Sequence, residues 1–395
     1  MVRAYAFMAA LLIYALFSAP TPDNIGIAEI LVLAGLLTGV GVSGVMQVTG
    51  LSIEENIPRW HFPARLLLMF GLSVPLVTGL VQGHVFSLIL RDIIPFLFLL
   101  LPLFLSPSFT DRTNLAKLFP YILCLMGLIF VVRVMVSFAI NVGAGHALME
   151  FMPDPGNLVN APTVLFAALF LTGTGGLWLA ESRTIPQALR SLCCFLLALI
   201  LLAGMAGIGQ RAHIGAWELT VALWIGMLAV KRPLSLWRVG LVLAVVGISL
   251  WPFAADILAG LAQKTSMVGL NNRAEEARAV WESFRDRPLA LLFGQGWGAS
   301  ITSPAVGPYP VNYTHSLLTT YLLKTGLCGL LLVLAYLGAL GAGAWRILWA
   351  YPVAGLAVAA PFLIDITLYA SFKTLDFGLL LVLMALWTRC PPQGR

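Results

Sequence analysis

The chain has 395 residues, of which 60% are hydrophobic and only 10% are charged, with a formal net charge of +6 and a mean hydropathy of +0.94. Soluble domains contain about 25% charged residues, so a single water-soluble core is excluded. The apolar residues form continuous runs instead of the alternating pattern of a transmembrane β-barrel. We therefore predict an all-α, polytopic integral membrane protein, whose positive charge marks cytoplasmic loops and indicates no nucleic-acid partner.

Segments that are long and apolar enough to cross a membrane follow one another along the whole chain. A spanning helix needs about 20 mostly apolar residues, and about twelve segments approach or exceed this length. The predicted spans are residues 4–20, 26–48, 64–82, 84–104, 116–140, 161–180, 187–207, 212–230, 236–258, 314–344, 347–370 and 374–388. The first resembles a signal peptide, but Pro20 occupies the expected cleavage region and further spans follow. We therefore predict an uncleaved first helix and a single transmembrane domain over residues 1–395.

The basic residues predict how these spans are oriented. With a cytoplasmic N-terminus, most arginine and lysine residues near the span ends fall on the cytoplasmic side, and the short outer loops carry only Arg211 and Lys373. Short cytoplasmic loops are enriched in basic residues, whereas long loops are exempt from this rule. We therefore expect both termini in the cytoplasm and the loops 142–160 and 259–313 on the outer face. The five cysteines all fall in or beside spans, so neither a disulfide framework nor a zinc site is predicted.

The outer loop 259–313 is the only long polar segment, and an amphipathic helix is predicted within it. Asn272 and Glu275 have the spacing of a capping box at the start of this helix. Its predicted apolar face consists of Ala274, Ala277, Trp281 and Phe284. The sequence FGQGWG follows at residues 293–298, and its three glycines permit a tight turn with positive φ angles. It lacks the Lys-Ser/Thr ending of a phosphate-binding loop.

Ionisable residues inside the predicted spans need partners or a polar cavity, because each charge costs at least about 2.5–3.5 kcal/mol at the bilayer centre. They are Arg91, Asp92, Arg133, Glu218, Lys324, Asp365 and Asp376. We predict that Lys324 pairs with Asp365 and that Lys373 pairs with Asp376 across one helical turn. These charges are therefore interpreted as structural.

Three polar residues are predicted to meet at the outer face: Arg211 at the start of a span, Arg273 at the start of the loop helix, and His315 before another span. Arginine binds phosphate through a planar bidentate guanidinium, and histidine can accept a proton near neutral pH. This set suits a reaction in which the arginines hold a diphosphate leaving group while the histidine deprotonates an attacking hydroxyl. Two simpler interpretations stay open: Arg211 reaches lipid headgroups or pairs with Glu218, two turns along the same helix, and His315 is an ordinary residue at a helix start.

The sequence around these residues resembles the superfamily of O-antigen ligases and polymerases. HSLLTTYLLKTGLCG, with His315, Ser316, Gly326 and Gly329, matches the pattern of His, Asn/Ser/Gln, nine residues, Gly, two residues and Gly/Thr/Tyr. The arginine in QRAHIGAW, the arginine in NNRAEEARAVW and the turn before the histidine follow the same order. The resemblance covers residues 204–330. Relatives often have Ser-Arg-Gly where this chain has Gln-Arg-Ala around Arg211, which leaves the geometry there open.

The resemblance implies a C-type glycosyltransferase-like membrane fold and a glycosyltransferase that needs no metal or cofactor. The implied donor is a glycan on undecaprenyl diphosphate, and the implied acceptor is the lipid A core oligosaccharide, at the periplasmic face of the bacterial inner membrane. His315 would be the general base, and Arg211 and Arg273 would bind the diphosphate. Residues in possible supporting roles are Ser316, Arg278 and Glu218.

Other functions stay open at this point. An O-antigen polymerase would use the same donor but a lipid-linked glycan as acceptor, and a protein acceptor is a further variant. A lipid-glycan transporter or flippase is a rival from another class, in which buried charges would line a path. Those charges would be Arg91, Arg133, Lys324 and Asp365. The absence of paired inverted repeats from the sequence disfavours this rival.

Overall fold

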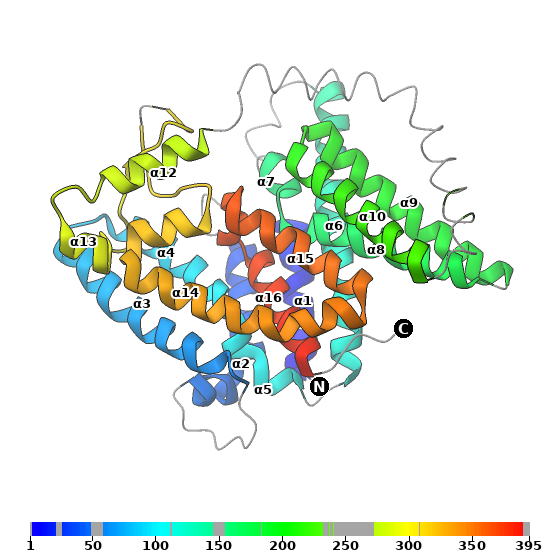
Figure 1. The fold of residues 1–395 in the computed structure, drawn as a ribbon, viewed down its shortest axis with the longest axis horizontal. Helices are drawn as coiled ribbons and strands as arrows, with labels where there is room; N and C mark the ends of the chain where they lie inside the picture. Colours follow the sequence, from blue (N-terminus) through cyan, green and yellow to red (C-terminus); the bar gives the residue numbers. More distant parts are fainter. Residues whose placement is uncertain are drawn as a thin grey trace.

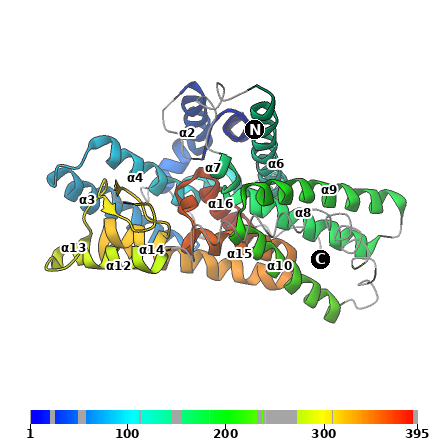
Figure 2. The same ribbon diagram turned by 90° about the horizontal axis from the view of Figure 1, so that it is seen from above.

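The protein is a helical bundle, described here from a computed structural model (Figures 1 and 2). The described residues are 2–20, 26–48, 58–110, 113–144, 155–182, 184–231, 237, 240, 272–307 and 309–389. The first part of the chain forms α1 (Val2–Phe17), α2 (Ile27–Val48), α3 (His61–Val81), α4 (Phe86–Leu99), α5 (Leu101–Thr110), α6 (Thr113–Ala144), α7 (Pro155–Val159), α8 (Pro162–Glu181), α9 (Ile185–Ile208) and α10 (Arg211–Lys231). The second part forms α12 (Arg273–Glu282), α13 (Pro288–Phe293), β1 (Ile301–Thr302), β2 (Pro310–Val311), α14 (Leu317–Ala350), α15 (Pro352–Thr367), the 3₁₀ turn η3 (Ala370–Lys373) and α16 (Leu375–Arg389).

The apolar helices identify a membrane-embedded protein. Within the described residues, six helical segments are long and apolar enough to cross a membrane: α3, Lys117–Ser137 of α6, α8, α9, Arg211–Val230 of α10, and α14. Shorter apolar helical segments occur in α1, α2, α15 and α16. The all-α membrane class is therefore confirmed, whereas the total of about twelve spans stays a prediction. The predicted span 236–258 lies outside the described residues, apart from positions 237 and 240.

The predicted span 84–104 is wrong in one respect, because the helix breaks between α4 and α5. Pro102 has no amide proton and cannot continue the hydrogen-bonding pattern of α4. The Leu103 amide donates to the Leu100 carbonyl at 2.9 Å. The hydroxyl of Tyr336 donates to the carbonyl of Leu99 at 3.1 Å. A side chain from α14 therefore supplies a bond at the position where the helix ends.

The core of the bundle surrounds α16. This helix packs against α4, α5, α8, α14 and α15, and almost every one of its residues is buried (Figure 2). Helix α8 is also largely buried, between α6, α9 and α15. A helix that is apolar on all sides is stable only when other helices or lipid surround it. α1 begins and α16 ends toward the side of the molecule opposite α12 and α13 (Figure 1).

The described part of the long polar loop forms a cap on one end of the bundle (Figure 1). Helix α12 packs onto α14 because Val280 and Phe284 form an apolar cluster with Leu323. β1 and β2 form an antiparallel pair, with Ile301 opposite Val311, and α12 also contacts β1. The cap is therefore attached directly above the start of α14.

The predicted apolar face of α12 is only partly correct, because Phe284 is buried but two of its other members are exposed. Trp281 is 59% exposed and Ala274 is exposed, whereas Glu276 is buried. The reason is that α12 turns the Glu276 carboxylate inward, where it accepts hydrogen bonds from His315 and Ser303. The predicted capping box is also absent: the Asn272 side chain donates to the carbonyl of Pro304 at 3.2 Å and makes no cap.

The glycine turn after α13 forms hydrogen bonds with α14 at the position where that helix is interrupted. Gly294, Gly296 and Gly298 have φ angles of 84°, 86° and 85°, so the predicted positive φ values are confirmed. Gly326 interrupts α14 with φ 66° and ψ −168°. The backbone amides of Gln295 and Gly296 donate to the carbonyls of Leu323 and Lys324, at 2.9 and 3.0 Å. The loop thus supplies hydrogen bonds where α14 loses its own.

The buried charges have different partners from those predicted. Lys324 forms an ion pair with Asp92 of α4, and Asp92 also accepts a hydrogen bond from the amide of Gly298 at 2.7 Å. Asp365 instead accepts from Ser371. The predicted Lys373–Asp376 pair is absent as well. Asp376 accepts hydrogen bonds from the hydroxyls of Tyr14 and Thr163, which come from α1 and α8.

Candidate active site

His315 lies directly before α14, in a segment that is held in place by hydrogen bonds of neighbouring serine and threonine hydroxyls. The Ser316 side chain caps α14 by accepting a hydrogen bond from the Leu318 amide, and it donates to the carbonyl of Ile366 at 2.9 Å. The buried hydroxyl of Thr314 lies 2.6 Å from that of Thr319 and 2.7 Å from that of Thr320. These bonds on both sides position the His315 backbone. Ser316 is therefore a helix cap beside His315.

The carboxylate of Glu276 binds His315 twice. Its Oε2 accepts from the backbone amide of His315 at 2.9 Å, and its Oε1 lies 3.1 Å from Nδ1 of the ring. The hydroxyl of Ser303 donates to Oε1 at 2.6 Å. Burial opposes ionisation of Glu276, but the hydrogen bonds from His315 and Ser303 outweigh it and lower the pKa of this carboxyl. Glu276 is therefore an anion that accepts three hydrogen bonds.

This contact determines which nitrogen of His315 is available for chemistry. An ionised carboxylate can only accept, so Nδ1 carries the proton that is shared with Glu276. The other nitrogen, Nε2, makes no hydrogen bond with any described residue, and the side chain is 21% exposed. A neutral imidazole with an open Nε2 is a proton acceptor. The arrangement of a carboxylate, an oriented imidazole and an open nitrogen is suited to general-base catalysis.

Arg273 stands at the first position of α12, three residues before Glu276. The guanidinium is half-buried, and its Nε makes no hydrogen bond with any described residue. Burial lowers the pKa of Arg273, while the nearby Glu276, Tyr369 and Tyr313 act in the opposite direction. Arginine stays charged in proteins, so this side chain can donate hydrogen bonds to an anion.

Tyr369 connects the two arginines that the sequence placed at the outer face. The backbone of Ala212 hydrogen-bonds to Tyr369, whose hydroxyl lies within electrostatic reach of both Arg211 and Arg273. The ring of Tyr369 packs edge-on against the buried ring of His213, with centroids 5.2 Å apart. The fold therefore brings Arg211 of α10 and Arg273 of α12 to the same aromatic side chain. Glu276 connects this group to His315.

Two of the suggested supporting residues lie at the surface of the described structure. Arg278 is on the exposed side of α12. Glu218 is also exposed, and among the described residues no ion pair joins it to Arg211. The ion pair between Arg211 and Glu218 is thus absent from the described residues.

Sequence reasoning missed Glu276, Tyr313 and Tyr369. Glu276 follows Glu275 in a polar helix, where two adjacent acids usually face solvent. The missing signal was the docking of α12 onto α14, which selects one of the two for burial. Tyr313 is two residues before His315, and their rings meet edge-on with centroids 5.7 Å apart. Tyr369 has no sequence signal, because only the packing of α15 against α10 brings it to Arg211.

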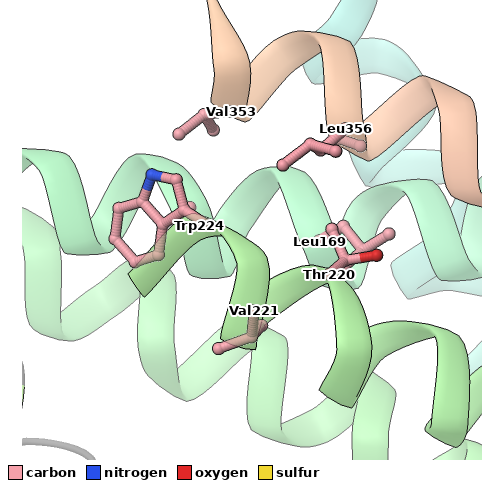
Figure 3. Close-up of a pocket in the computed structure, with 8 residues that line it drawn as sticks. Leu169, Thr220, Val221, Trp224, Val353 and Leu356 are labelled. Carbon is pink, nitrogen blue, oxygen red and sulfur yellow. The ribbon is translucent and has the colours of Figure 1, made fainter. Parts of the chain in front are cut away.

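A small pocket elsewhere in the bundle is lined by no ionisable side chain (Figure 3). Its walls come from α8, α10 and α15 and are apolar apart from the hydroxyl of Thr220 and the indole nitrogen of Trp224. Trp224, Val353 and Leu356 surround it in Figure 3. None of the ionisable residues around His315 lines it. This pocket is a packing feature between helices and not the candidate site.

No protein-family model and no curated protein matches this chain. The described residues contain no group of three or more His, Cys, Asp or Glu side chains that could hold a metal ion. The metal-independent reaction stays a prediction.

Proposed function

We propose that this membrane protein is a glycosyltransferase of the O-antigen ligase type, which uses a polyprenyl-diphosphate-linked glycan as donor. The observation that carries the proposal is the contact of His315 with Glu276, which leaves Nε2 open, while Arg273 lies within electrostatic reach of the same Glu276 and shares Tyr369 with Arg211. A proton acceptor next to fixed positive charges suits the displacement of a diphosphate by a hydroxyl group.

Each residue has a separate role in the proposed reaction. Nε2 of His315 takes the proton of the acceptor hydroxyl while the hydroxyl oxygen bonds to the anomeric carbon of the donor glycan. The bond between that carbon and the diphosphate oxygen breaks, and its electron pair leaves with the diphosphate. Arg211 and Arg273 bind the charge that develops on the leaving group. Glu276 stabilises the imidazolium that His315 becomes.

The proposed substrates follow the resemblance. The donor is a glycan on undecaprenyl diphosphate, and the acceptor is a sugar hydroxyl of the lipid A core oligosaccharide. The proposed location is the bacterial inner membrane, with both termini in the cytoplasm and His315 facing the periplasm. The distribution of basic residues supports this orientation.

An O-antigen polymerase shares the donor and the chemistry, so the acceptor alone separates it from a ligase. A transporter has less support from the buried charges. Arg133 donates to the carbonyls of Ala15 and Ser18, at 2.8 and 2.7 Å, and Lys324 is paired with Asp92. Charges that are held by fixed protein partners do not form a polar path.

The test is reconstitution of the purified protein in lipid vesicles with lipid-linked glycan and lipid A core, in the presence of a chelator. Glycan on lipid A indicates a ligase, and lengthened lipid-linked glycan indicates a polymerase. Movement of the donor without a covalent change would overturn the proposal in favour of a transporter.

The His315→Ala variant is the matched control in this assay. We expect loss of transfer by about 10²-fold or more, the usual contribution of a general base, with normal membrane insertion. Full transfer by this variant would show that His315 is not the base.

A further inference from the structure

Lys373 is a cation near the start of α14 and has no acidic partner among the described residues. It ends η3, in the connection between α15 and α16, and its side chain is half-buried. Its Nζ lies 5.1 Å from the centroid of the Tyr313 ring and 3.5 Å from the carbonyl oxygen of Asn312. The second distance is long for a hydrogen bond. A cation–π contact contributes about 0.5–2 kcal/mol, so the ammonium is only weakly compensated.

The acidic residues around Lys373 have other partners. Asp376 accepts from Tyr14 and Thr163, and Asp92 is paired with Lys324. No ion pair to Lys373 exists among the described residues. Burial and the charge of Lys324 lower the pKa of Lys373 to about 7, with Asp92 opposing this and Arg91 adding to it. The surroundings of this ammonium therefore carry more positive than negative charge, and a bound anion would stabilise its charged form.

Lys373 also adjoins the candidate active site. The Tyr313 ring contacts Lys373 and, edge-on, the ring of His315. Arg273 lies within electrostatic reach of the same tyrosine. η3 packs against α4, α15 and α16, so its backbone is fixed by three helices. Tyr313 therefore connects Lys373 with His315 and with Arg273.

We propose that Lys373 is a third cationic ligand of the candidate active site and binds an anionic group, a phosphate or carboxylate, of a substrate at His315. The inference deepens the proposed function and rests on it for the identity of the substrate. Two sources of the anion share this chemistry: the diphosphate of the donor and an acidic group of the acceptor glycan.

Anion binding tests the inference without a transfer assay. Purified full-length protein is titrated with inorganic pyrophosphate by calorimetry, as wild type, Lys373→Met, Lys373→Arg and Arg346→Met. Arg346 is an exposed cation near the far end of α14 and controls for the loss of one charge. We expect Lys373→Met to weaken binding by about tenfold, the effect of one charge-assisted hydrogen bond. Lys373→Arg and Arg346→Met are expected to bind as wild type does.

Two results would overturn the inference: equal affinity of wild type and Lys373→Met, or no pyrophosphate binding by the wild type. Thermal unfolding of each variant shows whether a loss reflects misfolding. For Lys373→Met, a melting temperature close to that of wild type is expected, because the side chain makes no ion pair with a described residue and the apolar methionine can still pack on the Tyr313 ring. If Lys373→Met unfolds early, Lys373→Gln is titrated in its place and must show the same loss.

The transfer assay then identifies the source of the anion. A rise in KM for the donor alone in Lys373→Met assigns the diphosphate. A rise in KM for the acceptor, matched by wild-type enzyme acting on dephosphorylated acceptor, assigns an acidic group of the acceptor. If the protein transfers no glycan but Lys373→Met still loses pyrophosphate binding, the proposed function fails and the anion site stands.

Discussion

The proton on His315 is positioned by a single carboxylate. Glu276 accepts from Nδ1 and from the backbone amide of the same residue, so it fixes the tautomer and the ring orientation together. The imidazole therefore keeps Nε2 open, and the proposed mechanism uses this nitrogen to accept the proton of the hydroxyl. The same carboxylate would attract the imidazolium once the proton has moved. In the proposed mechanism Glu276 is accordingly a positioning residue, whose effect on the substrate would pass through His315.

For Glu276→Gln we expect a fall in kcat of about 10²-fold or more, because an amide neither fixes the tautomer nor stabilises the imidazolium. The control is Glu275→Gln, which alters the exposed neighbour on α12 and should leave the rate unchanged. A wild-type rate in Glu276→Gln would remove Glu276 from the mechanism.

The same pair predicts how stability depends on pH. The folded state lowers the pKa of Glu276 from its ordinary value of 4.5, so this carboxylate stabilises the fold at neutral pH. The contribution is complete above the ordinary value and is lost as the pH falls through the lowered one. Melting temperatures should show wild type above Glu276→Gln at pH 7 and the two converging once the pH has fallen through the lowered pKa of Glu276. A difference that persists unchanged at low pH would contradict this.

Arg211 is the residue at which the shape of the side chain matters as well as its charge. We expect Arg211→Lys to lower kcat/KM by about 10- to 100-fold, since an ammonium cannot reproduce a bidentate contact with a diphosphate. Arg278→Lys, on the exposed side of α12, is the matched control. Wild-type activity in Arg211→Lys would favour a residue that only reaches lipid headgroups.

At the scale of elements, the break in α14 and the glycine turn above it form one unit. The break frees two carbonyls, and the amides of Gln295 and Gly296 bind them. Asp92 of α4 joins the same unit by accepting from Gly298 and pairing with Lys324. The cap is thus attached to two helices, α4 and α14. Because the cap carries Glu276 and Arg273, the position of these side chains depends on the break.

Gly326→Ala should disrupt this unit. An added Cβ would lie 2.5 Å from the amide nitrogen of Gly294 and from backbone atoms of Leu292, and the φ of 66° with ψ of −168° favours glycine. We expect destabilisation by about 1–3 kcal/mol from backbone strain alone, measured as free energy of unfolding in mixed micelles.

Gly338→Ala in the same helix is the control for this substitution. An added Cβ there meets no atom within 4 Å, so we expect a stability equal to wild type or greater by about 0.5–1 kcal/mol. Equal stability of Gly326→Ala and Gly338→Ala would mean that the break in α14 is dispensable.

At the scale of the whole molecule, the orientation in the membrane decides on which side the reaction occurs. The basic residues predict that the cap faces the outside and that the connection between α8 and α9 faces the cytoplasm. The exposed positions Val306 and Thr184 are suited to test this.

In a cysteine-free background, Val306→Cys should react with a membrane-impermeant thiol reagent in intact spheroplasts. Thr184→Cys should react only after lysis. The reverse pattern would invert the topology and place His315 in the cytoplasm, which would contradict the proposed donor chemistry.

The sequence by itself determined the helical membrane class, most of the apolar segments and the positive φ angles of the glycine turn. These are local properties: hydrophobicity over about 20 residues suffices to predict a span, and only glycine tolerates such angles readily. The tertiary structure decided the partners: Asp92 for Lys324, Glu276 for His315, and Tyr369 between Arg211 and Arg273. The partners of each such group lie far apart along the chain, so no local pattern predicts them. The energy that pairs them arises only when helix packing excludes water and brings the groups within bonding distance.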